Sequence, residues 1–443
     1  MGSGTRETFK GGDSLERNGS KHVTAYHSPS QGLHATFRSD GRPQRISKDI
    51  PAANGRPASH MEISRGPSNR LRVETTQRLP SGHEAHLLSY GNHREIRLVD
   101  PKRPGIETRV VYHGNQAQTR EYRTMRYSYR SGSGNFGVVS YYRPLPLVTF
   151  APAYYEWLVA QAPWGAPVRY TVANWGWSGQ PWFTAYGAGF QPYAQYRTPE
   201  EWLTDYIIAA QLQQMYLDSQ QPAAASPGGD PDSEPTTSGS APPPEIPADV
   251  KEDMKLDIRT ELEREKGAGS SDQRPTNDTP EALLDHSFLV DTAPIEAALS
   301  TKQTCDLAEG DMLRHVPDDG LDPNNPKVNG SPTVKVTVKF GHADSKHPGL
   351  CAEGNAVYVQ LADLQEIHNH KVELLAPGEK KMQADAKFSS KRPPQAKLKQ
   401  ESAPNLSPED AAQLADLRKQ LDQQSTDASS TDQQVSAVAS KSS

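Results

Sequence analysis

The chain has no long apolar runs. Only 34% of its 443 residues are hydrophobic, and its mean hydropathy is -0.77. The longest uninterrupted apolar runs cover a few residues, as at Ile207–Ala210, whereas a membrane-spanning helix needs about 18 to 20. We therefore predict no transmembrane segment. The N-terminus also lacks the apolar core of a secretory signal, so we expect either an internal protein or a true start further upstream.

Cysteine is nearly absent. Cys305 and Cys351 are the only two, and both fall in one stretch with the composition of a small β domain. Because neither has another cysteine to pair with, we predict that they form a disulfide, which implies an oxidising compartment. Two unrelated free thiols in a cytoplasmic protein are the alternative that the sequence leaves open.

Catalytic signatures are missing as well. The sequence has no Gly-x-Ser-x-Gly elbow, no glycine-rich phosphate loop and no spaced set of metal ligands. We therefore expect a protein that is not an enzyme and needs no cofactor. His368 and His370 would share one face of a strand, but no acidic or cysteine residues complete a ligand set, so they are weak metal candidates and we predict no metal site.

Charge is distributed unevenly along the chain. Residues 1–150 contain 23 Lys and Arg against 12 Asp and Glu, whereas the chain as a whole has a net charge of -6. A basic front half could dock on an anionic partner such as nucleic acid. Because the arginines alternate with carboxylates, mutual attraction of the two halves is the simpler interpretation.

The front half is predicted to contain one folded region. Residues 1–58 have isolated apolar residues without a period, so we expect a disordered basic arm. Over 59–218 we expect a meander of β-hairpins, with Gly-Asn turns, followed by an aromatic segment. A helix over 199–218 should end it, because Thr198 and a following proline form a helix start.

The rear half is predicted to be a second folded region on flexible connections. We expect a Pro, Ser and Gly-rich linker at 219–247, a charged helix at 248–266 with a narrow apolar stripe, and another linker at 267–284. Residues 285–376 read as a small, five-stranded β barrel, and 377–443 as a disordered tail with a short helix at 408–423. The fold class is therefore mainly β with a few helices, in several segments and partly disordered.

Aromatic residues are concentrated in one place. All six tryptophans lie between Trp157 and Trp202. Most of them are expected to form the core of a region poor in Leu and Ile, but exposed rings could be stacking platforms for sugars or bases. The candidate ligand-binding residues are Trp175, Trp177, Trp182 and Tyr193.

Two stretches carry a resemblance to known proteins. The aromatic segment, with YYEWLVAQAPWGAPVRYTVANWGWSGQPWF, and the rear segment, with CDLAEGDMLRH and LCAEGNAVYVQLADLQEIHNH, resemble a group of uncharacterised bacterial proteins. Those proteins combine a Tyr/Trp-rich region with a small SH3-like barrel, and many look exported. The resemblance implies an SH3-like barrel at 285–376 and brings no known activity.

These observations lead to one functional hypothesis with two alternatives. We expect a non-enzymatic structural or binding protein of the bacterial periplasm or cell envelope, with the barrel and the aromatic region contacting a protein or a cell-wall polymer. Anion or nucleic-acid binding through the basic front half is the first alternative. A secreted hydrolase is a remote one, and a cytoplasmic location is the alternative compartment.

Overall fold

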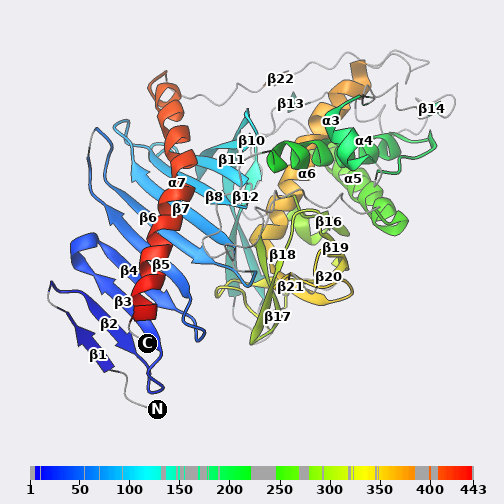
Figure 1. Ribbon diagram of the computed structural model, residues 1–443. Coiled ribbons are helices and arrows are strands. Elements are labelled where there is room, and N and C mark those ends of the chain that lie inside the picture. Colours follow the sequence, from blue (N-terminus) through cyan, green and yellow to red (C-terminus); the bar gives the residue numbers. More distant parts are fainter. Residues whose placement is uncertain are drawn as a thin grey trace. The chain divides into compact units, whose positions relative to one another are not determined.

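The structure is a computed structural model of the chain (Figure 1). Within its described part, no helix is both long and apolar enough to cross a bilayer. The residues that it describes are 5–9, 11–53, 55–68, 70–91, 93–130, 136–145, 148–149, 154, 168–169, 177, 179–187, 190–220, 246–268, 279–291, 294–317, 321–322, 324–344, 347, 349–384, 399–400 and 408–441.

The chain divides into two compact units, which we describe separately. Unit 1 comprises residues 1–121, 221–239 and 404–443, and unit 2 comprises 122–220 and 240–403. The fold is mainly β with several helices, as the sequence predicts.

Unit 1 is an antiparallel meander in which each strand pairs with the one before it in the sequence. Its elements are β1 (Thr5–Thr8), β2 (Ser14–Arg17), β3 (Val23–Ser28), the short 3-10 helix η1 (Pro29–Gln31), β4 (Leu33–Phe37), β5 (Pro43–Ile50), β6 (Ser59–Arg65), β7 (Leu71–Arg78), β8 (Glu84–Tyr90), β9 (His93–Val99), β10 (Ile106–His113), the first part of β11 (Gln116–Arg130) and helix α7 (Pro408–Lys441).

One face of this meander is apolar because side chains alternate along each strand. Ile46, Ile63 and Val73 are cross-strand neighbours on β5, β6 and β7 and are almost completely buried. Helix α7 lies across these strands (Figure 1), and its Ala428 and Val435 join the same apolar cluster. The sheet is thus covered on one side by a helix from the far end of the sequence.

The contact between α7 and the sheet is partly polar. Gln424 is 2% exposed and donates its amide to the backbone oxygens of Val73 at 2.8 Å and Leu87 at 3.1 Å. Arg65 and Asp432 form a buried bidentate ion pair, at 2.5 and 3.2 Å. The buried residues of α7 recur at three- and four-residue spacing, which is one helix face: Leu417, Leu421, Gln424, Ala428, Thr431 and Val435.

Two predictions of disorder are wrong. The arm predicted at 1–58 contains β1 to β5, and the predicted short helix at 408–423 extends to Lys441, in a tail expected to be disordered. The apolar residues of these segments are sparse, so neither segment could bury them alone. They are buried because the two segments pack against each other: Leu15 of β2 and Ala439 of α7 belong to one cluster.

The predicted hairpin meander is confirmed. The two turns expected at Gly-Asn pairs connect β8 to β9 and β10 to β11. Their glycines, Gly91 and Gly114, have φ angles of 52° and 60°, in the left-handed region that glycine adopts at little cost.

Unit 2 combines a second sheet with a layer of helices. Its elements are the rest of β11, β12 (Phe136–Pro144), β13 (Val148–Thr149), β14 (Val168–Arg169), α3 (Pro181–Tyr186), β15 (Gln195–Tyr196), α4 (Pro199–Ser219), α5 (Ala248–Ala268), the 3-10 helix η2 (Glu281–Leu283), β16 (Ser287–Leu289), β17 (Ile295–Ser300), β18 (Gln303–Leu307), β19 (Met312–His315), β20 (Thr333–Phe340), β21 (Ala356–Gln360), α6 (Leu361–Ala384) and β22 (Lys399–Gln400).

The second sheet has six strands in the order β16-β19-β20-β21-β17-β18. The prediction of five strands is therefore wrong, and residues from Leu361 onward form α6 instead of the end of a barrel. Leu361, Leu364 and Ile367 recur every three residues and are buried against the sheet, a spacing that fits a helix. The SH3-like description of this region stays a prediction.

The predicted disulfide is confirmed. Cys305 on β18 is bonded to Cys351, with 5.1 Å between their Cα atoms. Both residues are buried, at 3% and 0% exposed, among the valines of β20 and β21. The bond joins β18 to the segment before β21, and therefore two parts of one hydrophobic core.

The helical layer follows the sequence predictions closely. In α4 the predicted cap is present, because the Thr198 hydroxyl accepts a hydrogen bond from the Glu201 amide. The apolar stripe of α5, with Val250 and Met254, is buried in the same cluster as α4. The linkers predicted at 219–247 and 267–284 lie for the most part outside the described residues.

Candidate functional site

The tryptophans predicted as ligand platforms are core residues where the structure describes them. Trp177 is 8% exposed and Trp182 is 2% exposed. Their rings pack edge to face, with centroids 5.6 Å apart, and Trp177 also contacts Phe190. A stacking platform needs an exposed ring, and both of these rings are instead buried in the apolar cluster that α4 and α5 also build. Trp175 lies outside the described residues.

Tyr193, the fourth candidate, is half-buried and joins α4 to α5. The ammonium of Lys251 lies 3.9 Å from its ring centroid, and its hydroxyl donates to Glu252 at 3.0 Å. Lys251 also binds Asp205, at 2.6 Å, and the other oxygen of that carboxylate accepts from the Tyr196 hydroxyl. Burial and the nearby Glu252 raise the pKa of Tyr193. This tyrosine is therefore already engaged within the protein.

His368 and His370 do not form a metal site with each other. They lie on α6, where residues two apart point in different directions. His368 Nδ1 is 2.7 Å from Asp285, and His370 pairs with Asp291. The described residues include no group of three or more His, Cys, Asp or Glu placed to hold a metal ion.

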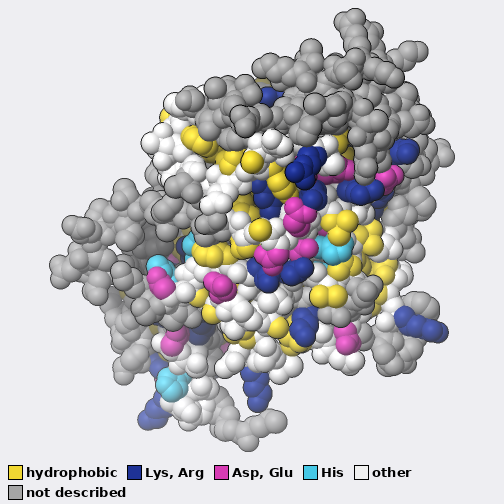
Figure 2. Space-filling model, turned by 90° about the vertical axis from the view of Figure 1, so that its right-hand side faces the viewer, with side chains coloured by type: hydrophobic (Ala, Val, Ile, Leu, Met, Phe, Trp, Pro, Cys, Tyr) yellow, Lys and Arg dark blue, Asp and Glu magenta, His cyan; other side chains and the backbone are white. Residues whose placement is uncertain are grey.

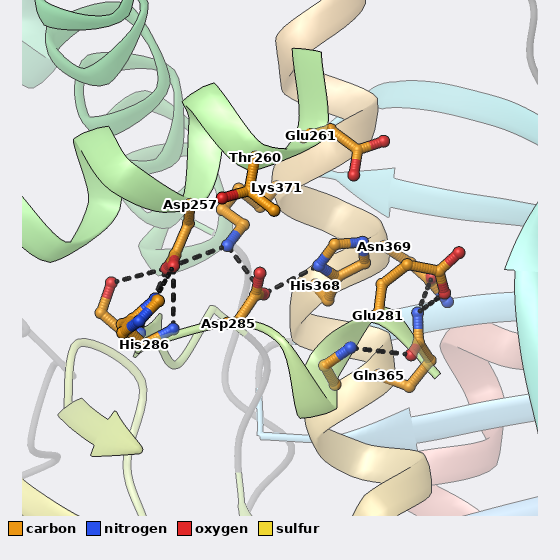
Figure 3. Close-up of polar contacts among 12 residues, drawn as sticks. Asp257, Thr260, Glu261, Glu281, Asp285, His286, Gln365, His368, Asn369 and Lys371 are labelled. Atoms are coloured by element: carbon orange, nitrogen blue, oxygen red, sulfur yellow. Dashed lines mark hydrogen bonds and ion pairs between the residues drawn. The ribbon is translucent and has the colours of Figure 1, made fainter. Parts of the chain in front are cut away.

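His368 instead belongs to a buried cluster of charged residues (Figure 3). At its centre the ammonium of Lys371 lies between two carboxylates, 2.7 Å from Asp285 and 3.4 Å from Asp257. Asp257 also binds His286, through its backbone amide at 2.8 Å and its ring at 2.9 Å. The cluster thus joins α5, α6 and the segment between η2 and β16.

A second group extends the cluster along α6. Gln365 is fully buried and accepts from the backbone amide of Ala282 at 3.2 Å. Its own amide donates to Glu281 at 3.2 Å and to Asn369 at 2.9 Å. Glu281 forms an ion pair with Arg143 at 2.5 Å. Every part of this group binds another element, so it fixes the position of α6 relative to η2 and β12.

The pKa values of the cluster follow from burial and from its pairing of charges. Burial alone would raise the pKa of Asp285, but the charges of His368 and Lys371 outweigh it and leave that pKa below its ordinary value. Burial would lower the pKa of Lys371, and Asp285 and Asp257 outweigh this and raise it. The hydrogen bond with Asp257 raises the pKa of His286. Lys371 is therefore a protonated cation and not a free nucleophilic amine.

The cluster is also closed to solvent. His368 is 3% exposed, Lys371 7%, Asp285 5% and Asp257 2%. A substrate could reach the His368 ring only if α6 moved away from its neighbours. The arrangement therefore stabilises the helical layer, and it contains an Asp–His pair without an open path to it.

The sequence contains a weak signal for this cluster. Gln365, His368, Asn369 and Lys371 fall within two turns of a helix whose other buried positions, apart from Glu379, are apolar or glycine. Polar residues on the buried side of a helix require partners. Their partners, Asp257 and the residues near Asp285, are about 80 to 110 positions away in the sequence, so the pairing cannot be read from local spacing.

Comparison of the chain with protein-family models, with curated proteins and with solved structures finds no match.

Proposed function

We propose that the protein is a non-enzymatic structural or binding component of the bacterial periplasm or cell envelope. The disulfide between Cys305 and Cys351 carries this proposal. Disulfides form and persist in oxidising compartments and are rare in the cytoplasm. On the chain-entropy model, a bond across a separation of 46 residues stabilises a domain by about 4 kcal/mol. The partner that we propose is a protein or a cell-wall polymer.

The buried charged cluster supports a structural role. Its strongest polar groups, Lys371, Asp285 and Asp257, bind one another and are shielded from solvent. Buried ions that are paired and hydrogen-bonded are tolerated, and they fix one arrangement of the elements that supply them. The cluster therefore favours a rigid scaffold over a reaction centre.

Charge pairing weakens the alternative of an anionic partner. Several arginines of the front half already form ion pairs, which reduces the positive charge available to phosphates. Figure 2 shows the side of Figure 1 that carries α3, α4 and α5, and there too Lys and Arg side chains lie beside Asp and Glu side chains. The paired arginines are Arg17 with Glu7, Arg45 with Glu62, Arg65 with Asp432, Arg97 with Glu95, Arg103 with Glu121 and Arg109 with Glu107.

The test is the state of the two cysteines in the native host. Cells are quenched in acid, and free thiols are labelled with a maleimide that adds mass, before and after reduction. We expect no label on the unreduced protein and two labels after reduction. Two labels before reduction would contradict the envelope assignment. A Cys305→Ser variant, with one label in both samples, shows that the remaining cysteine is accessible to the reagent.

A further inference from the structure

Helix α6 contains a weak point close to its end, at Pro377 and Gly378. A proline inside a helix cannot donate the backbone hydrogen bond to the residue four positions before it, and its ring disturbs the preceding turn. The glycine that follows has more backbone freedom than any other residue. The last turns of α6, residues 378–384, are therefore joined to the rest of the helix by an easily bent connection. We call residues 378–384 the end segment.

The end segment is nevertheless well packed within unit 2. It lies beside α4 and α5 (Figure 1), and its Met382 is 1% exposed in the same apolar cluster as Leu203 of α4 and Leu262 of α5. The hydroxyl of Tyr154, which is itself completely buried, donates to the backbone oxygen of Glu379 at 3.1 Å. Packing against neighbouring elements therefore holds a segment that the helix backbone alone connects weakly.

The side chain of Glu379 is buried in this contact. Glu379 is 1% exposed, and its Oε1 atom has no hydrogen-bond partner among the described residues. The other buried titratable residues described on α6, His368 and Lys371, both bind an aspartate. A buried carboxyl group without a cation is tolerated when it is neutral and is costly when it is ionised.

The carboxylates opposite Glu379 make its ionisation harder still. Burial is the main reason that its pKa lies well above the ordinary value of about 4.3, and the negative charges of Glu265 and Glu261 on α5 raise that pKa further. The other titratable groups of the surrounding elements are engaged elsewhere or exposed: Arg264 with Glu261, Lys381 over the Tyr206 ring, Tyr154 on the backbone of α6, and Lys380 toward solvent.

We propose that Glu379 is a pH-dependent switch for the end segment. While its carboxyl group is protonated, the end segment stays packed against α4 and α5. When the proton is lost to solvent, the new negative charge is repelled by Glu261 and Glu265, and the end segment detaches at Pro377. This inference goes beyond the proposed function, because it depends on α6 and its neighbours and not on the compartment.

The direction of the switch follows from the sign of the pKa shift. The pKa of Glu379 is higher in the folded protein than in the unfolded chain. Protonation therefore stabilises the packed state fully below the unfolded pKa of about 4.3, and this stabilisation is lost as the pH rises through the higher, folded pKa. The end segment should be packed in acid and released as the pH rises.

Hydrogen-exchange mass spectrometry on the full chain at pH 5 and pH 8 tests this proposal. Protection of each segment is expressed relative to the exchange rate of an unstructured peptide at the same pH, which removes the chemical effect of pH. We expect the protection of the end segment to fall about tenfold or more from pH 5 to pH 8, because one unit of pKa shift corresponds to a tenfold change. Glu379→Gln carries no charge at either pH, so its end segment should be equally protected at both.

The controls separate this switch from general effects of pH. Glu263→Gln removes an exposed carboxylate from α5 and should keep the difference seen in the wild type. Residues 361–371 lie before Pro377 on the same helix and should lose much less protection than the end segment. The proposal is overturned if wild-type protection is the same at both pH values, if Glu379→Gln loses protection as the wild type does, if Glu263→Gln abolishes the difference, or if residues 361–371 lose as much protection as the end segment.

Discussion

Replacement of Lys371 by methionine should strongly destabilise unit 2. Methionine keeps most of the apolar stem, so the main loss is the ammonium that lies between Asp285 and Asp257. Both carboxylates are almost completely buried. Removal of one partner from a buried ion pair costs about 3 to 5 kcal/mol, because the remaining charge is left uncompensated. We expect a loss of that size in the free energy of unfolding at pH 7.

The cost of Lys371→Met should depend on pH. In the folded wild type the pKa of Asp285 is lower than in the unfolded chain, where it is about 4. The ionised carboxylate therefore stabilises the fold fully at a pH above the unfolded pKa. This stabilisation is lost as the pH falls through the lower pKa of the folded state. Without Lys371 the carboxylate should take up a proton more readily. The destabilisation should therefore be smaller at pH 4 than at pH 7, by about 1 kcal/mol or more.

Urea unfolding followed by tryptophan fluorescence measures this effect. All six tryptophans lie between Trp157 and Trp202, inside the sequence range of unit 2. Lys380→Met is the matched control, because Lys380 is exposed on the same helix, and it should change stability by no more than about 0.5 kcal/mol. A cost below about 1 kcal/mol for Lys371→Met, or the same cost at both pH values, would refute the reasoning.

Two further substitutions test other contacts. Gly378→Ala places a Cβ 2.7 Å from the Tyr206 ring, so we expect the free energy of unfolding to fall by about 1 to 3 kcal/mol. Urea unfolding followed by tryptophan fluorescence measures this change, and an unchanged midpoint would contradict that contact. Asp432→Asn leaves the buried Arg65 without its anionic partner. This weakens the contact of α7 with the sheet, so the backbone amides of α7 should exchange hydrogen with solvent faster. Asp416→Asn, on the exposed side of α7, is the control and should leave this exchange unchanged.

Local signals in the sequence predict local structure well. The start of α4 follows from Thr198 and Pro199, and the hairpin turns follow from glycines that the structure places at positive φ. The disulfide follows from the presence of only two cysteines, both in one small region. In each case the residues that decide the structure are close in sequence or are the only ones available.

The candidate site could not be predicted in the same way. Lys371 is 86 positions from Asp285 and 114 from Asp257, and no spacing rule connects them. The sequence did draw attention to His368, as a possible metal ligand together with His370. Two histidines at this spacing share one face only if the segment is a strand. Because α6 is a helix, each histidine pairs with a different aspartate instead.

The wrong predictions of disorder have a related cause. Mean hydropathy averages over one segment, whereas burial is decided by the segment that packs against it. The buried side of α7 includes Gln424 and Asp432, which lower its apolar content, yet both have partners on the sheet. A polar group that exchanges water for a protein partner costs little on burial. Low hydropathy therefore predicts disorder only where the polar residues have nothing else to bind, and in α7 their partners lie more than 330 positions away.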